Sequence, residues 1–188
     1  AMPPLQAFIK QTDAEGTPVS AAGNKEEAEY MLVCAEYELR NPNSIELLRE
    51  YLDAYPDTPH ANRICALIAS AYFFEGKYDD ALAMFNSSRL DLLSNEERDD
   101  MTYRLATCYL KTGNVKEAAI WFETLRSTGS RYTADCTYYL AYIRYSQQRY
   151  DDALSGFLSL QDNAKYEALV PYCLLYTSPS PRDRQKSR

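Results

Sequence analysis

One pattern of small and aromatic positions comes back three times along the chain. Residues 76–85 read GKYDDALAMF, and residues 113–122 and 148–157 repeat the order of a polar turn, an alanine and a phenylalanine four residues later. The alanines are Ala81, Ala118 and Ala153, which lie 37 and then 35 residues apart. A sequence period of that size is typical of stacked helical units.

Each copy predicts a helix that leaves room for a neighbour on one face. An alanine and a phenylalanine four residues apart lie on the same side of a helix, and a small residue beside a large one lets two helices cross closely. Upstream of the copies, a large apolar residue precedes an alanine at Ile68-Ala69, Leu105-Ala106 and Leu140-Ala141. The sequence therefore predicts helix pairs whose first helices cover residues 59–75, 94–111 and 132–147.

An earlier, degenerate pair is predicted from residue 25 onward, with Ser44 and Leu48 in place of the alanine and the phenylalanine. Helix starts are predicted from side chains that can accept from free backbone N–H groups and from a proline at the first helical position. These starts are Asn24 with Glu27, Asn43 with Glu46, Thr58 with Pro59, Ser94 with Glu97 and Asn114 with Glu117.

At these residues the chain resembles the tetratricopeptide repeat (TPR) family, whose unit is a pair of antiparallel helices. The resemblance covers residues 24–172, as about four units and the start of a fifth. It implies an all-α, right-handed solenoid of antiparallel helix pairs. It also implies a non-catalytic scaffold that binds protein or peptide segments on a concave surface.

In that family the first helix of each unit lines the concave surface. Carried onto this sequence, the resemblance implies a partner-binding groove formed by Arg63, Ser70, Phe73, Tyr103, Thr107, Lys111, Tyr138, Tyr142 and Tyr145. Tyrosine offers a large amphipathic contact area, which suits peptide recognition. The alternative is that several of these tyrosines pack against the next unit or against one another.

Net charge and the length of the apolar runs bear on which partners the protein can bind. The chain has 188 residues and a formal net charge of −7, which opposes nucleic-acid binding because phosphate contact needs clustered Lys and Arg. No apolar run reaches the roughly 18 residues that a membrane-spanning helix needs. We therefore expect a protein or peptide partner, no nucleic acid and no membrane-spanning segment.

No residue pattern predicts chemistry. His60 is the only histidine and is expected to be solvated in the first turn of a helix. The five cysteines contain no Cys-x-x-Cys pair, so neither a zinc site nor a redox motif is predicted; small buried thiols are expected instead, with the redox compartment left open. Acidic clusters fall at helix starts, where they complement the helix dipole. The sequence predicts no enzyme, no catalytic residue, no metal and no cofactor.

The two ends differ from the repeats. Residues 1–23 carry Pro3, Pro4 and Pro18 and are interpreted as a linker or the remnant of a preceding unit. Residues 173–188 resemble a translated sequencing adaptor, with a native Ser/Pro/Arg linker as the alternative, and are expected to be disordered. An uncapped array leaves an apolar end face open, so self-association through the end helices is also expected.

Residues 39–42 and 51–61 are similar to the tetratricopeptide units of bacterial outer-membrane assembly lipoproteins and related envelope proteins. This similarity favours the bacterial cell envelope or periplasm, with the cytoplasm as the alternative location. Two other functions stay open: a structural spacer in a larger cell-envelope protein, or an accessory segment of a truncated enzyme.

Overall fold

The computed structural model describes residues 22–167, 170 and 173, and in this part of the chain every regular element is a helix. The helices are α2 (Ala22–Glu38), α3 (Ser44–Ala54), α4 (Ala61–Phe74), α5 (Tyr78–Ser87), the 3₁₀ turn η1 (Leu90–Leu92), α6 (Asn95–Lys111), α7 (Val115–Ser127), α8 (Thr133–Ser146) and α9 (Tyr150–Leu158). The all-α fold class predicted from the sequence is confirmed.

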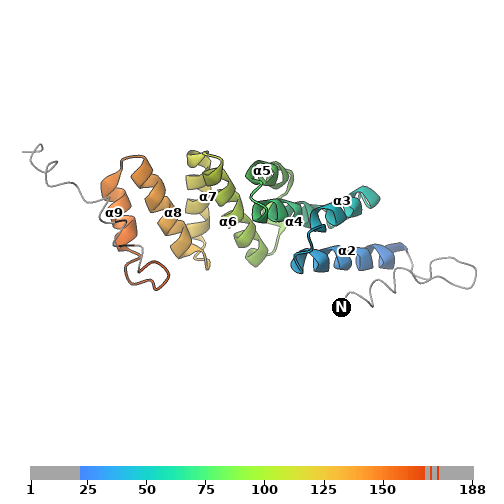
Figure 1. The fold of residues 1–188 in the computed structure, drawn as a ribbon. Coiled ribbons are helices and arrows are strands. Elements are labelled where there is room, and N and C mark those ends of the chain that lie inside the picture. The colour runs from blue at the N-terminus through green and yellow to red at the C-terminus, as the bar shows by residue number, and fades with distance from the viewer. Residues whose placement is uncertain (1–21, 168–169, 171–172, 174–188) are drawn as a thin grey trace, which may run out of the picture. The chain divides into compact units, whose positions relative to one another are not determined.

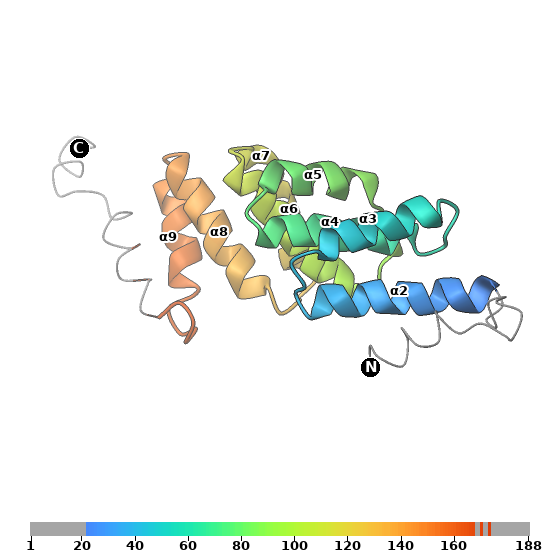
Figure 2. The same cartoon turned by 45° about the vertical axis from the view of Figure 1, so that its right-hand side comes forward.

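Consecutive helices pack in pairs: α2 with α3, α4 with α5, α6 with α7 and α8 with α9. The partners lie side by side in two views of the molecule (Figure 1; Figure 2). The turns between partners are short, which makes them antiparallel. Pairs also stack on one another, since α3 packs on α4 and α7 packs on α8.

The chain forms two compact units, Ala1–Leu93 and Ser94–Arg188. The first unit contains α2 to α5 and η1, and the second contains α6 to α9. Of the predicted N-terminal linker, residues 1–23, the structure describes only Ala22 and Gly23, which belong to α2. Of the predicted adaptor-like tail, residues 173–188, it describes only Cys173. Val170 and Cys173 are helical.

The three repeated alanines occupy equivalent places. Ala81, Ala118 and Ala153 lie in α5, α7 and α9 and are completely buried. The phenylalanines four residues later, Phe85, Phe122 and Phe157, are at most 3% exposed. Ser44 and Leu48 of α3 are buried in the same way, which confirms that the degenerate first pair uses the same packing.

Small residues also bring the first helices close to their partners. Ala69, Ala106 and Ala141 are completely buried in α4, α6 and α8. A methyl group added to Gly156 of α9 would lie 2.8 Å from the Cβ atom of Ala141, well inside van der Waals contact. The α8–α9 crossing therefore depends on a glycine in one helix and an alanine in the other.

The predicted helix starts were right in the second unit and only in part in the first, where α3 does begin directly after Asn43. Ser94 Oγ accepts from the Glu97 backbone N–H, and Asn114 Oδ1 accepts from that of Glu117. Asn24 instead lies inside α2, and Asn43 makes no capping bond. Thr58 does not cap α4 because that helix begins at Ala61, and its hydroxyl donates to the Glu26 carboxylate at 2.7 Å.

Each helix pair turns through a left-handed residue. Gly76 has φ 75° and Gly113 has φ 83° in the α4–α5 and α6–α7 turns. Gln148 has φ 62° at the equivalent place between α8 and α9. A side chain in this region costs about 1–2 kcal/mol relative to glycine, so the α8–α9 pair keeps the turn geometry of its neighbours without the favoured residue.

Candidate functional site

The predicted groove residues differ in exposure. Arg63, Ser70 and Phe73 belong to α4 of the first unit, and the others belong to α6 and α8 of the second. Exposed side chains are Arg63, Lys111 and Tyr142; half-buried ones are Phe73, Tyr103, Tyr138 and Tyr145; buried ones are Ser70 and Thr107.

Two of the predicted residues have almost no surface to offer a partner. Ser70 is 0% exposed and Thr107 is 7% exposed. The Thr107 hydroxyl donates to the Tyr103 carbonyl oxygen one turn earlier, at 2.8 Å. Their positions on α4 and α6 turn them into the packed interior, because a shift of one residue rotates a side chain by about 100° around a helix.

A recurrent arrangement, which we call the ring clasp, covers part of the first-helix surface. It begins with a carboxylate and a tyrosine three residues later, which share one face of a first helix. An aromatic ring from the segment after the second helix stacks on that tyrosine, and the polar tip of the ring contacts the carboxylate. The three ring clasps are Glu27, Tyr30 and His60; Asp100, Tyr103 and Tyr132; and Asp135, Tyr138 and Tyr166.

The geometry of the three copies is similar. The stacked ring centroids are 3.7, 4.4 and 5.0 Å apart, with interplanar angles of 8°, 12° and 20°. His60 Nε2 lies 3.1 Å from Glu27 Oε2, and the Tyr132 hydroxyl donates to Asp100 Oδ1 at 3.0 Å. The Tyr166 hydroxyl donates to Asp135 in the same way. Because a stacked aromatic pair contributes about 0.5–1.5 kcal/mol beyond its buried area, each clasp fastens a helix pair to the segment that follows it.

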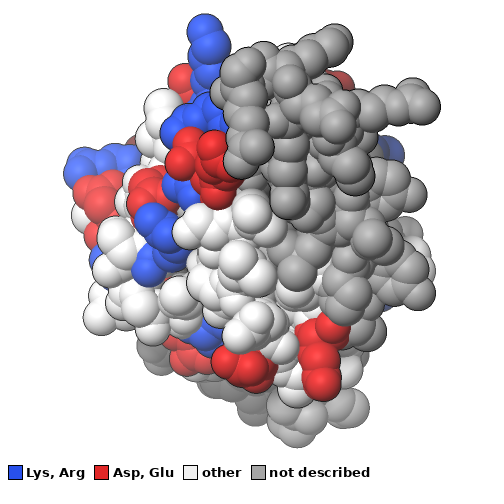
Figure 3. Space-filling model, turned by 90° about the vertical axis from the view of Figure 1, so that its left-hand side faces the viewer, with Lys and Arg blue, Asp and Glu red and all other residues white. Residues whose placement is uncertain are grey.

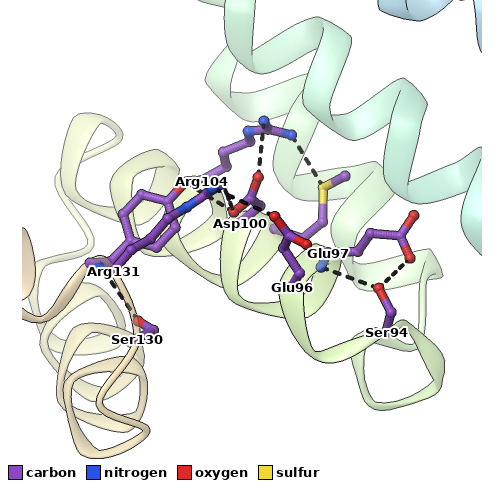
Figure 4. A network of polar contacts seen from close by, with 9 residues as sticks. Ser94, Glu96, Glu97, Asp100, Arg104, Ser130 and Arg131 are labelled. Carbon is purple, nitrogen blue, oxygen red and sulfur yellow. Dashed lines mark hydrogen bonds and ion pairs between the residues drawn. The ribbon is translucent and has the colours of Figure 1, made fainter.

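Cations reinforce the two clasps of the second unit. Arg131, next to Tyr132, pairs with Asp100, as Figure 4 shows. Lys165, next to Tyr166, pairs with Asp135, whose carboxylate is buried. Arg104 also approaches Asp100, at 4.0 Å. The outer cations are well exposed, so each pair contributes at most about 1 kcal/mol, and the stacked rings are the stronger part of the clasp.

The ring clasps change the interpretation of two predicted groove tyrosines. Tyr103 and Tyr138 lie under the rings of Tyr132 and Tyr166. Burial raises the pKa of both tyrosines above the usual value of 10.0. For these two residues the contacts agree with the alternative interpretation, in which first-helix tyrosines pack against the following segment. The signal was present in the sequence as an acid, a tyrosine three residues later and an aromatic residue 31–33 positions after the acid.

The remaining first-helix surface of α8 is open. Tyr142 is 50% exposed, and Tyr145 packs against Tyr150, which is 46% exposed, with tilted rings whose centroids are 5.6 Å apart. We call Tyr142, Tyr145 and Tyr150 the open tyrosine face. It offers ring surface for apolar contact together with hydroxyl groups for hydrogen bonds, which is the combination found at protein interfaces.

His60 was predicted to be solvated, and this prediction was wrong. Its side chain is only 25% exposed because the ring stacks on Tyr30 while Nε2 meets Glu27. Arg63, one of the predicted groove residues, donates a hydrogen bond to the Tyr30 hydroxyl at 2.5 Å. The only histidine of the chain therefore serves as the ring of the first clasp.

Two of the five cysteines, Cys108 and Cys136, are the small buried thiols that the sequence predicts, and Cys34, Cys65 and Cys173 are only half-buried. Cys108 and Cys136 are completely buried, and burial raises the pKa of each thiol to about 12. A thiol with so high a pKa is a poor nucleophile at neutral pH, so these two serve as small apolar residues of the core.

Charged side chains of both signs are mixed on the surface of the described part. Lys and Arg side chains alternate with Asp and Glu on the face drawn in Figure 3, and uncharged residues occupy its middle. Within the described ranges, no group of three or more His, Cys, Asp or Glu side chains is placed to hold a metal ion. None of the helices described is both long and apolar enough to cross a membrane.

Comparison with known protein families indicates the same class of helical repeat that the packed helix pairs indicate. Residues 66–133 match a family model described as the tetratricopeptide repeat. The matched range starts inside α4 and ends at the first residue of α8. No curated protein matches the chain. Tetratricopeptide repeats are in general protein-interaction scaffolds and typically lack enzymatic activity, so the matched region is similar to a class of binding modules.

Proposed function

We propose that the protein is a non-catalytic scaffold that binds a protein or peptide segment through the open tyrosine face of the second unit. The observation that carries this proposal is Tyr142, a large amphipathic side chain that is 50% exposed on a first helix. The resemblance to the tetratricopeptide repeat family supports it, because in that family the first helix of each unit lines the concave surface and α8 is the first helix of its pair.

Tyr142 is suited to dominate such an interface. A tyrosine buries a large area at the loss of few rotatable bonds, and the best-packed aromatic residues of an interface contribute at least about 2 kcal/mol each. Tyr145 and Tyr150 already hold each other in place. A partner side chain that packs against Tyr142 therefore meets a surface that is partly fixed before binding.

The test is a peptide selected from a random display library against the whole protein. Tyr142→Ala should weaken binding of that peptide by about tenfold or more, since loss of about 1.4 kcal/mol gives a factor of ten. The thermal midpoint should stay within a few degrees of the wild-type value, because the removed ring lies half in solvent. Isothermal titration gives the affinity, and circular dichroism gives the midpoint.

Leu158→Ala is the matched control, because Leu158 is a large apolar residue 42% exposed on α9, outside the open tyrosine face. It should leave the affinity unchanged. If Tyr142→Ala binds the selected peptide as tightly as wild type, or unfolds the protein, the assignment of this face is wrong.

A structural spacer is the second candidate function, and the ring clasps favour it. They use Tyr103 and Tyr138, two of the predicted groove tyrosines, for packing inside the chain. A spacer needs rigid junctions and no ligand. Under this alternative, the library selection yields no peptide whose binding depends on Tyr142.

We also propose a cell-envelope setting, which the similarity of residues 39–42 and 51–61 to envelope repeats supports. Fractionation of cells that express the protein from its own gene tests it, and recovery in the cytoplasm alone would contradict it. Self-association through end helices stays a prediction that light scattering checks.

A further inference from the structure

A second surface of the second unit lies between α7 and α8, where the chain forms a hollow of about 520 Å³. Ala119 and Ile120 of α7 and Leu140 and Ile143 of α8 form its apolar part, and Arg144 and Arg149 also line it. Its volume falls in the usual range of ligand pockets, roughly 300–1,000 Å³. We call it the α7–α8 hollow.

The hollow is separate from the open tyrosine face. Tyr142 and Arg144 are two residues apart on α8 and so point to nearly opposite sides of the helix, about 160° apart. Leu140, Ile143 and Arg144 share one side of α8, at helical spacings of three and four. The two surfaces can therefore be altered independently.

Apolar surface in the hollow is open to solvent. Ile120 is 57% exposed, although it is a large aliphatic side chain. The Thr124 hydroxyl donates to the Ile120 carbonyl at 2.9 Å, and the Ser127 hydroxyl donates to the Thr124 carbonyl at 2.6 Å. Because both hydroxyls already bond the helix backbone, an apolar side chain of a ligand could pack here without displacing a polar group from its partner.

The charge of the hollow selects an acidic ligand. Glu123, the one acidic side chain among the described residues that line it, already pairs with Arg126, and Arg149 pairs with Asp152 at 2.5 Å. Among the described residues, the Arg144 guanidinium pairs with no carboxylate. A hollow lined by both an arginine and an exposed isoleucine is complementary to a ligand that carries both a carboxylate and an apolar side chain.

We propose that the α7–α8 hollow binds an acidic peptide segment that carries an apolar anchor, with its carboxylate on Arg144 and its anchor on Ile120. None of the described residues that line the hollow is aromatic, so they do not offer the stacking that holds single-stranded nucleic acid. The net charge of −7 repels an acidic peptide at long range, whereas Arg144 acts within a Debye length of about 8 Å. We therefore expect a modest affinity that comes from direct contact with Arg144 and not from long-range attraction.

Fluorescence anisotropy with a labelled synthetic peptide of alternating glutamate and leucine tests the proposal on the full chain. Wild type should bind it, and Arg144→Glu and Ile120→Asp should each weaken binding by about tenfold or more. Lys77→Glu, the same charge change in the exposed α4–α5 turn, should leave binding unchanged. A peptide with lysine in place of glutamate should bind the Arg144→Glu variant better than wild type.

Four results would overturn the proposal: no binding of the peptide to wild type, equal binding to Arg144→Glu, equal binding of a peptide with serine in place of leucine, or tighter binding of a single-stranded oligonucleotide. Circular dichroism of both variants separates loss of the site from loss of the fold. Because Tyr142 lies on another side of α8, failure of the open tyrosine face as a binding surface would leave these results unaffected.

Discussion

Replacing Tyr132 with alanine is expected to lower the free energy of unfolding of the second unit by about 3 kcal/mol, at the lower end of the values for a buried aromatic residue. The ring stacks on Tyr103 with centroids 4.4 Å apart, and its hydroxyl bonds Asp100 at 3.0 Å. Alanine removes both contacts and opens a gap beside the core that contains Phe122. Urea unfolding followed by circular dichroism measures the loss.

Tyr132→Phe is the matched control, because it keeps the stacked ring and removes only the hydroxyl. Its expected loss is about 1 kcal/mol, the net contribution of one hydrogen bond, since Asp100 keeps its contact with Arg131. If the alanine and phenylalanine variants are equally stable, the stacked rings contribute nothing and the ring clasp is only a polar contact.

Raising the pH above about 9 is expected to lower the free energy of unfolding of the second unit. Cys108 and Cys136 have a pKa near 12 in the folded chain against 9.0 for a free thiol, because burial disfavours the thiolate. Burial also raises the pKa of Tyr103 and Tyr166, and the Asp135 carboxylate adds to the effect on Tyr166. The folded state therefore holds these protons more tightly than the unfolded state does.

The sign follows from this difference in proton binding. Below pH 9 the thiols are protonated in both states and stability is unaffected; above pH 9 the unfolded chain ionises first, so the free energy of unfolding falls as pH rises towards 12. Each buried thiol contributes about 1.4 kcal/mol per pH unit, and the pair should remove up to ~5 kcal/mol between about pH 9 and 11.

Urea titrations at a series of pH values in reducing buffer measure the alkaline loss. A Cys108→Ala, Cys136→Ala double variant is less stable at neutral pH but should lose less stability on going from pH 9 to 11. Constant wild-type stability over this interval would contradict the burial of the thiols.

The repeated helix pairs were predictable because the packing rule is local. A small residue with a phenylalanine four positions later needs only one helix to define its face, and Ala81, Ala118 and Ala153 are completely buried. Ser94 and Asn114 were predictable for the same reason, since a helix start involves residues within one turn.

The binding surface was harder to predict because it depends on contacts between distant segments. The ring clasps join residues 31–33 positions apart, and this is why Tyr103 and Tyr138 looked available from the sequence. Ser70 and Thr107 were included although their direction around the helix turns them inward. The α7–α8 hollow combines side chains of two helices that no single sequence pattern links.

The central claim is that the tyrosines of the second unit fall into two classes: those held in ring clasps and those left open for a partner. Peptide-resolved nitration by tetranitromethane, read by mass spectrometry on the native protein, tests it most directly. Tyr142, which is 50% exposed, should be modified first. Tyr103, Tyr132, Tyr138 and Tyr166 should react last, because burial shields them and raises the pKa of each phenol. Modification of Tyr132 or Tyr138 as fast as Tyr142 would contradict the account.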